Sequence, residues 1–336
     1  MKRILLLAAL LAFSGLSSAS VRVPAGANIQ SYLNVSSGQL LILSAGAYST
    51  VGLTCVSNMA IETDGKVTIN SSSSAPIINL AGCSNVSIRG DLELVGNGAG
   101  YTSHPSSQVV DSGQSGIYLS GNDNIVIEGV RIRNIRGSGI EAHSTLTSWK
   151  NSIFIRGVSV KNSYRGIYLT DSAEYITLSD INASDNVFGI QIDSGNNTVV
   201  NAKTIYNSIG VKICGSINSY CSGANNAHGI FSGLESNHNY YNLVIVDVTV
   251  GETFSACHFV AGQSGSNAGT IQIINSKGIN ITGSQIGSNL TIDGNSVVSL
   301  QGSYMRSGLS GATVSPGGIL ISKNNFNDQG LWPGNN

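Results

Sequence analysis

Gly166-Ile167-Tyr168-Leu169 and Gly189-Ile190-Gln191-Ile192 are two copies of a short pattern that recurs along the middle of the chain. In both copies the residues behind the glycine alternate between the two faces of a β-strand, with Ile or Leu on one face. The full set, spaced by 21 to 27 residues, begins at Gly116, Gly139, Gly166, Gly189 and Gly210. A second pattern, of the type Asn-Ile-x-Ile, alternates with the first and begins at Asn85, Asn124, Ser152, Tyr175, Asn242 and Gly278.

A repeat of this length, built from short alternating strands and turns rich in Gly, Asn and Ser, predicts a β-solenoid. Helical repeats are excluded because their units need amphipathic stretches with a period of 3.6 residues. Each coil would bury its Ile, Val and Leu side chains against the coils above and below it. At some 22 to 25 residues per coil, residues 20–336 predict about a dozen coils and a rod roughly 60 Å long.

The chain begins with a basic segment, Met1-Lys2-Arg3, and an apolar run from Ile4 to Phe13 follows it. This run is too short to cross a bilayer, since a spanning helix needs about 20 apolar residues. The small side chain of Ala19 suits cleavage before the next residue. The sequence therefore predicts a signal peptide over residues 1–19.

The remaining chain is expected to form one domain. Residues 20–50 are predicted to be an N-terminal cap with the first coil, residues 51–323 the parallel β-helix, and residues 324–336 a C-terminal cap or tail. Only 10% of the residues are charged and the formal net charge is −1, which excludes a nucleic-acid binder that relies on basic charge. We expect an exported protein, secreted, periplasmic or on the cell surface, without stable insertion into a membrane.

Five cysteines in an exported chain favour disulfides. Cys55 and Cys83 hold nearly the same place in successive repeats, and the spacing of neighbouring strands lies within the Cα separation that a disulfide tolerates. We expect these two to be bonded. Cys214 and Cys221 are close enough in sequence to close a short loop, and Cys257 is then expected to be a small buried hydrophobic residue.

Together with the repeats, the entry segments Val23-Pro24-Ala25-Gly26 and Leu43–Tyr48 resemble the pectate-lyase-like right-handed parallel β-helix superfamily over nearly the whole mature chain. The resemblance implies an all-β, right-handed parallel β-helix with three parallel sheets, an association with carbohydrates and frequent export. Lyases, hydrolases, epimerases and non-catalytic proteins share this architecture, so the fold does not choose among them.

Aligning the Gly-Ile strands predicts which side chains leave the same outer face, because alternate residues point to opposite sides of a strand. The predicted outward row is Tyr118, Glu141, Tyr168, Gln191 and Lys212. Arg165, His143 and Asp193 are expected to flank it. Three long insertions, Gly96–Gln114, His143–Asn151 and Cys214–His228, are expected to border a solvent-exposed groove for a polysaccharide or a cell-surface glycan.

Our leading hypothesis is a polysaccharide lyase, which removes the proton next to a uronate carboxylate and eliminates the glycosidic oxygen. This chemistry needs a group that neutralises the carboxylate, a base near the ring carbon and a proton donor. The predicted catalytic residues are Lys212, Arg165, Tyr168 and His143. The predicted substrate-binding residues are Glu141, Gln191, Asp193, Tyr118 and, as a flat surface for a sugar ring, Trp149.

Two other readings stay open. An inverting glycoside hydrolase would use Glu141 and Asp193 as its two carboxyl groups, although the Asp-Asp and Gly-His-Gly strings of β-helical polygalacturonases and the Asp-Pro-His-Asp string of alginate epimerases do not occur here. A non-catalytic adhesin or spike that binds glycans is the second alternative. No metal site and no certain cofactor are predicted; Ca²⁺ stays open because Glu141, Asp171 and Asp193 are hard oxygen ligands. A monomer or a trimer is expected.

Overall fold

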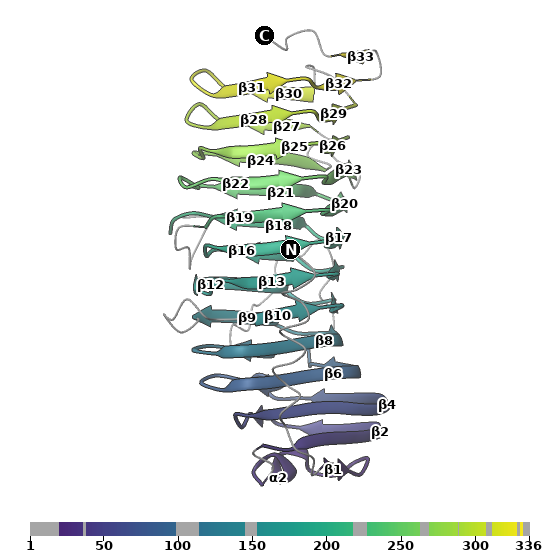
Figure 1. Ribbon diagram of the computed structural model, residues 1–336. Helices are drawn as coiled ribbons and strands as arrows, with labels where there is room; N and C mark the ends of the chain where they lie inside the picture. The colour runs from purple at the N-terminus through teal and green to yellow at the C-terminus, as the bar shows by residue number, and fades with distance from the viewer. Residues whose placement is uncertain are drawn as a thin grey trace.

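The computed structural model describes residues 20–35, 38–98, 114–144, 153–217, 227–262, 269–287, 289–306, 311–327 and 330–331. The chain winds into a rod of stacked coils (Figure 1), with the short helix α2 (Ile29–Leu33) and strand β1 (Ser20–Val23) at one end and β31 to β33 at the other. This confirms the predicted all-β parallel β-helix. The predicted signal peptide, residues 1–19, lies outside the described residues.

One sheet contains the Gly-Ile strands and contributes one strand per coil. Its eleven parallel strands show that the solenoid has about eleven coils, close to the expected dozen. In chain order they are β3 (Leu53–Thr54), β5 (Ile78–Asn79), β7 (Ser115–Leu119), β9 (Ser138–Ser144), β12 (Arg165–Ser172), β15 (Phe188–Ile192), β18 (Ile209–Cys214), β21 (Tyr241–Val246), β24 (Thr270–Ile274), β27 (Leu290–Ile292) and β30 (Ala312–Val314).

The other two faces are joined into one sheet because four long strands run across the corner between them: β2 (Leu40–Thr50), β4 (Met59–Ser71), β6 (Ser84–Val95) and β8 (Asp123–Arg133). The first face continues from β1 and these strands through β10 (Ile153–Arg156), β13 (Ile176–Ser179), β16 (Asn197–Val200), β19 (Gly229–Ser232), β22 (Glu252–Ser255), β25 (Ile279–Thr282), β28 (Val297–Gln301) and β31 (Ile319–Lys323). The second continues through β11 (Ser159–Lys161), β14 (Asn182–Ser184), β17 (Lys203–Ile205), β20 (Glu235–Asn239), β23 (His258–Gly262), β26 (Gln285–Ile286), β29 (Tyr304–Met305) and β32 (Phe326–Asn327). β33 (Gly330–Leu331) pairs with β32 in the antiparallel sense.

The core is a set of stacked apolar rows along the axis. In the Gly-Ile sheet, one fully buried row is Ile117, Ile140, Ile167, Ile190, Val211, Leu243, Ile271 and Leu290. This register corrects one assignment from the sequence: the copy at Asn242 belongs to the Gly-Ile sheet, because Leu243 pairs with Val211. The glycine of the pattern has a steric cause, since a Cβ on Gly189 would lie 2.5 Å from the carbonyl oxygen of Gly210.

Buried asparagines hold the turn that leads into this sheet. The backbone N–H of Asn186 donates to Oδ1 of Asn207 (2.9 Å), and that of Asn207 donates to Oδ1 of Asn239 (2.8 Å). All three side chains are inaccessible to solvent. The ladder satisfies backbone groups that the turn would otherwise leave unpaired inside the protein, so it keeps the turn in one conformation.

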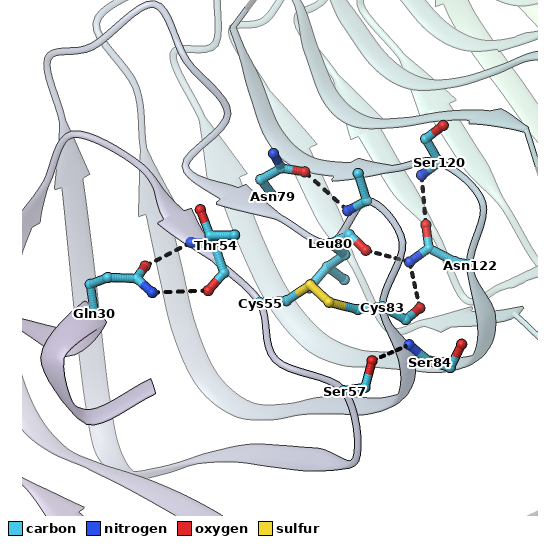
Figure 2. Close-up of a disulfide and its surroundings, with 11 residues drawn as sticks. Gln30, Thr54, Cys55, Ser57, Asn79, Leu80, Cys83, Ser84, Ser120 and Asn122 are labelled. Atoms are coloured by element: carbon cyan, nitrogen blue, oxygen red, sulfur yellow. Dashed lines mark hydrogen bonds between the residues drawn. A yellow bond between two sulfur atoms is a disulfide. The ribbon is translucent and has the colours of Figure 1, made fainter. Parts of the chain in front are cut away.

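The predicted disulfide between Cys55 and Cys83 is present, with a Cα–Cα distance of 6.5 Å (Figure 2). It joins neighbouring coils beside β3 and β5. Cys214 is also disulfide-bonded, but its predicted partner Cys221 lies outside the described residues. Cys257 is a free, buried thiol. No helix in the described part of the chain is long and apolar enough to span a bilayer.

Candidate functional site

The predicted outward row lies on one line of the Gly-Ile sheet. Tyr118 pairs with Glu141, Glu141 with Tyr168, Tyr168 with Gln191, and Gln191 with Lys212, so each side chain has the next one directly above it. The stacked isoleucines on the inner face set this register, because a slip of one residue would turn them toward solvent. We call Tyr118, Glu141, Tyr168, Gln191 and Lys212 the polar row.

At one end of the polar row, a chain of hydrogen bonds surrounds Glu141. Nε2 of His143 lies 2.7 Å from Oε1 of Glu141, and Nδ1 of His143 lies 2.9 Å from Oδ2 of Asp171. Ser115 Oγ donates to the other oxygen of Glu141 at 2.7 Å. Sequence reasoning did not select Ser115, which directly precedes the glycine of its strand.

These contacts decide the charges of the two central groups. The hydrogen bond to Glu141 raises the pKa of His143 despite its burial, and Asp171 raises it further. Burial acts to raise the pKa of Glu141, but the hydrogen bonds from His143 and Ser115 outweigh it and the pKa is lowered. The pair therefore favours an imidazolium beside a carboxylate.

In the middle of the row, Asp193 turns back toward two of its members. Its Oδ2 accepts hydrogen bonds from the Tyr168 hydroxyl (3.1 Å) and from Nε2 of Gln191 (2.9 Å). Burial raises the pKa of Asp193 to about 6. Burial, reinforced by the charge of Asp193, raises the pKa of Tyr168 to about 12, so its hydroxyl stays protonated at neutral pH. Oδ1 of Asp193 is buried and has no hydrogen-bond partner in the described part of the chain.

Two cationic side chains, Arg165 and Lys212, lie beside Tyr168, Gln191 and Asp193. Arg165 donates from Nε to Oε1 of Gln191 at 2.9 Å, and its guanidinium lies 4.2 Å from the centre of the Tyr168 ring. The Lys212 ammonium lies 5.1 Å from the centre of the Phe188 ring. Burial lowers the pKa of Lys212, and the charge of Arg165 contributes in the same direction against the effect of Asp193. By strand order Arg165 lies two coils from Lys212, but the Arg165 side chain extends toward Lys212 as far as Gln191 of the coil between them.

Four of the five residues of the polar row are buried and Tyr118 is partly exposed, so most of the row is less accessible than the predicted solvent-exposed groove would make it. Relative exposure is 6% for Glu141, 6% for Tyr168, 2% for Gln191 and 9% for Lys212. The long side chains shield one another, as Arg165 does over Tyr168. The exposed edge lies at His143 and Asp171, whose side chains are 33% and 53% exposed.

Of the predicted catalytic and substrate-binding residues, Trp149 lies outside the described residues, as do most of the three long insertions. Within the described residues, no group of three or more His, Cys, Asp and Glu side chains is arranged to hold a metal ion. The residues that form the candidate site in the described part of the chain are Ser115, Glu141, His143, Arg165, Tyr168, Asp171, Gln191, Asp193 and Lys212.

The comparisons with known proteins find likeness in structure only. No family model matches the sequence, and no curated protein matches it. The A-module of the Azotobacter vinelandii mannuronan C-5 epimerase AlgE4 is similar with a TM-score of 0.60 and 16% identity, over 90% of each chain. The A-module of the A. vinelandii epimerase AlgE6 gives a TM-score of 0.58 and 15% identity, over 89% of this chain and 83% of the other.

Pectate lyase Pel9A is similar with a TM-score of 0.50 and 14% identity, over 93% of this chain and 80% of the enzyme. At identities this low the likeness concerns the fold and not the reaction. It agrees with the architectural resemblance inferred from the repeats. The chain has a parallel β-helix fold, as these two epimerase modules and this pectate lyase do.

Proposed function

We propose that the protein binds a uronate-containing polysaccharide at the polar row and cleaves it by β-elimination. The observation that carries this proposal is the convergence of Lys212, Arg165 and Tyr168 around Asp193 on three adjacent strands. The structurally similar proteins support the substrate class, because a mannuronan epimerase and a pectate lyase are both named for polymers of uronic acids.

Each group has a role that its surroundings favour. Arg165 would neutralise the uronate carboxylate, which acidifies the neighbouring C–H group, whereas both ring nitrogens of His143 are already engaged by Glu141 and Asp171. Lys212 would be the base, since burial and the nearby guanidinium increase its neutral fraction. Tyr168, protonated at neutral pH, would be the proton donor, and Asp193 would orient its hydroxyl.

The elimination balances with these residues alone. The Lys212 amine takes the proton from the carbon next to the carboxylate, and the electrons of that C–H bond form the new C=C bond. The bond from the adjacent carbon to the glycosidic oxygen breaks, and the leaving oxygen receives the Tyr168 proton. Water then returns a proton to Tyr168 and removes one from Lys212.

Ultraviolet absorbance of the unsaturated product tests this proposal, with pectate, alginate, mannuronan and glycosaminoglycans as substrates and with and without Ca²⁺. We expect product with at least one polyuronate, at least 100-fold less with Lys212→Met or Tyr168→Phe, and an unchanged rate with Lys203→Met. The control removes a lysine from β17, where it pairs with Glu235 away from the polar row. Absence of unsaturated product from every polymer would overturn β-elimination, and polymer binding without product would favour the non-catalytic alternative.

Hydrolysis is the second candidate, because the surroundings move the pKa values of Glu141 and Asp193 in opposite directions. A carboxylate and a carboxylic acid at the same pH are what an inverting hydrolase needs. New reducing ends without unsaturated product, lost in both Glu141→Gln and Asp193→Asn, would identify this reaction.

We also propose that the protein acts outside the cytoplasm. The disulfide between Cys55 and Cys83 supports this, since such bonds persist in oxidising compartments. Expression of the full chain in bacteria, followed by fractionation, tests it. Retention of the full-length chain in the cytoplasm, with both thiols reduced, would contradict it.

A further inference from the structure

A column of residues with left-handed backbone runs along the turn that leads into the Gly-Ile sheet. Strand pairing aligns these residues coil by coil, and their φ angles lie between 52° and 60°. In order along the axis they are Asn134, Asn162, Asp185, Tyr206 and His238. Asn and Asp tolerate this conformation, whereas it strains a bulky residue.

The conformation of the turn therefore does not explain why a tyrosine stands at position 206. Its side chain does not contribute to the core, because the residue is 45% exposed. The ring instead lies against His238 of the next coil, with 5.2 Å between ring centres. A strained backbone at a bulky residue that adds nothing to the core points to a binding role.

More aromatic rings gather at the same edge of the sheet. Tyr240 and Tyr241 pack edge to face at 5.1 Å, and Tyr164 and Phe188 pack in the same manner at 5.4 Å. All four are partly exposed. We call Tyr164, Phe188, Tyr206, His238, Tyr240 and Tyr241 the aromatic edge.

The aromatic edge is continuous with the polar row and is held rigidly. The Arg165 guanidinium lies 4.9 Å from the centre of the Tyr164 ring, and Phe188 contacts the Lys212 ammonium. The buried Asn207 and Asn239, which directly follow Tyr206 and His238, hold the turn through their hydrogen bonds. Preorganised rings lose little conformational freedom when a ligand binds.

We propose that the aromatic edge binds the pyranose rings that flank the reacting sugar, through contact of their C–H faces with the exposed rings. This inference rests on the proposed function for the identity of the reacting sugar. Coils are about 4.8 Å apart, which is close to the length of one sugar in an extended chain, so successive coils would meet successive sugars. Aromatic faces carry no charge, so these subsites would accept neutral as well as acidic pyranoses.

Affinity electrophoresis through gels that contain pectate, alginate or hydroxyethylcellulose tests the aromatic edge without relying on catalysis. The variant is Tyr206→Asn, which installs the residue type that the turn prefers. We expect affinity for a retarding polymer to fall about three- to tenfold, while the thermal midpoint stays level or rises. Where product forms, the loss should fall on KM with kcat nearly unchanged.

Tyr175→Asn is the matched control. Tyr175 also has a left-handed backbone, with φ 60°, but it lies on the turn at the other end of β12. Relief of strain should be similar in both variants, whereas only Tyr206→Asn should weaken binding. Equal affinity of wild type and Tyr206→Asn, or no retardation of the wild type by any polymer, would overturn the aromatic edge as a binding surface. Retardation that depends on Tyr206 without cleavage of any polymer would overturn β-elimination and leave the aromatic edge supported.

Discussion

Glu252 is a buried acid inside the solenoid, and it makes a quantitative prediction about stability. It begins β22 and points inward with Phe254; its residue is 1% exposed. Its neighbours in register are Gly229 and Ile279, which carry no charged side chain. Neither carboxyl oxygen has a hydrogen-bond partner of good geometry within the described residues.

The magnitude follows from the change in protonation. Burial raises the pKa of Glu252 from 4.5 to about 8, against a small opposing effect of the Gly229 backbone. The folded chain therefore holds this proton over a pH range in which the unfolded chain releases it. This stability contribution is complete below pH 4.5 and is lost as the pH rises through about 8. A rise of this size corresponds to about 5 kcal/mol, at 1.36 kcal/mol per pKa unit.

Glu252→Gln removes the titration and keeps the shape of the side chain. Near pH 4.5 the variant and the wild type should have similar stability, because both carry a neutral group. Near pH 9 the variant should be more stable by up to about 5 kcal/mol, which corresponds to a thermal midpoint roughly 10 °C higher. Thermal unfolding by circular dichroism across this pH range measures the difference.

The difference between variant and wild type isolates Glu252 from other titrating groups such as His143. Glu62→Gln is the control, because Glu62 lies in β4 opposite Arg89 and is partly exposed. It should show no comparable gain at high pH. If Glu252→Gln keeps the same pH dependence as the wild type, the carboxyl is hydrated or paired in the folded protein and the reasoning is wrong.

Three further predictions follow from other parts of the molecule. Asn207→Ala removes the acceptor of the Asn186 N–H and a donor to the Ala183 carbonyl and should destabilise the fold by about 2–4 kcal/mol in denaturant titrations; a loss no larger than that of Asn182→Ala, at an exposed position of β14, would refute it. The double variant Cys55→Ser/Cys83→Ser removes the disulfide between residues 28 apart and should lower the free energy of unfolding by about 3–4 kcal/mol. If a reductant destabilises the wild type and the variant equally, the loss of this disulfide does not explain the difference between them. If β-elimination is the reaction, the rate should rise as the pH passes about 6 and Asp193 ionises, and Asp193→Asn should remove that limb from the pH–rate profile; an unchanged limb would assign it to another group.

The repeat predicted the outward row because the direction of a side chain in a strand is a local property of the sequence. In a strand, alternate side chains face opposite sides, and the inner Ile, Val and Leu of successive coils must stack. The order from Tyr118 to Lys212 could therefore be derived by aligning the Gly-Ile copies, and the pairing of the strands follows that alignment. The same logic anticipated the disulfide between Cys55 and Cys83.

Side-chain contacts at or beyond the strand ends could not be predicted from the alternation of the strands. Asp193 follows the last residue of β15, and only the course of the chain there turns its carboxylate back to Tyr168. Asp171 reaches His143 across neighbouring coils. Tyr206 and Glu252 stand where the repeat elsewhere places Asn or an apolar residue, so their significance became visible only after the coils were aligned in space.

The sequence by itself determined the solenoid and the order of side chains along its outer face, since strand alternation and stacking need only the period of the repeat. The tertiary structure decided how deeply those side chains are buried, which of them form hydrogen bonds or ion pairs with one another, and which rings meet at the aromatic edge. The physical reason is that these properties depend on distance and local dielectric between residues from different coils, over 20 positions apart in the chain for Tyr168 and Asp193. Stacking of the coils sets both quantities.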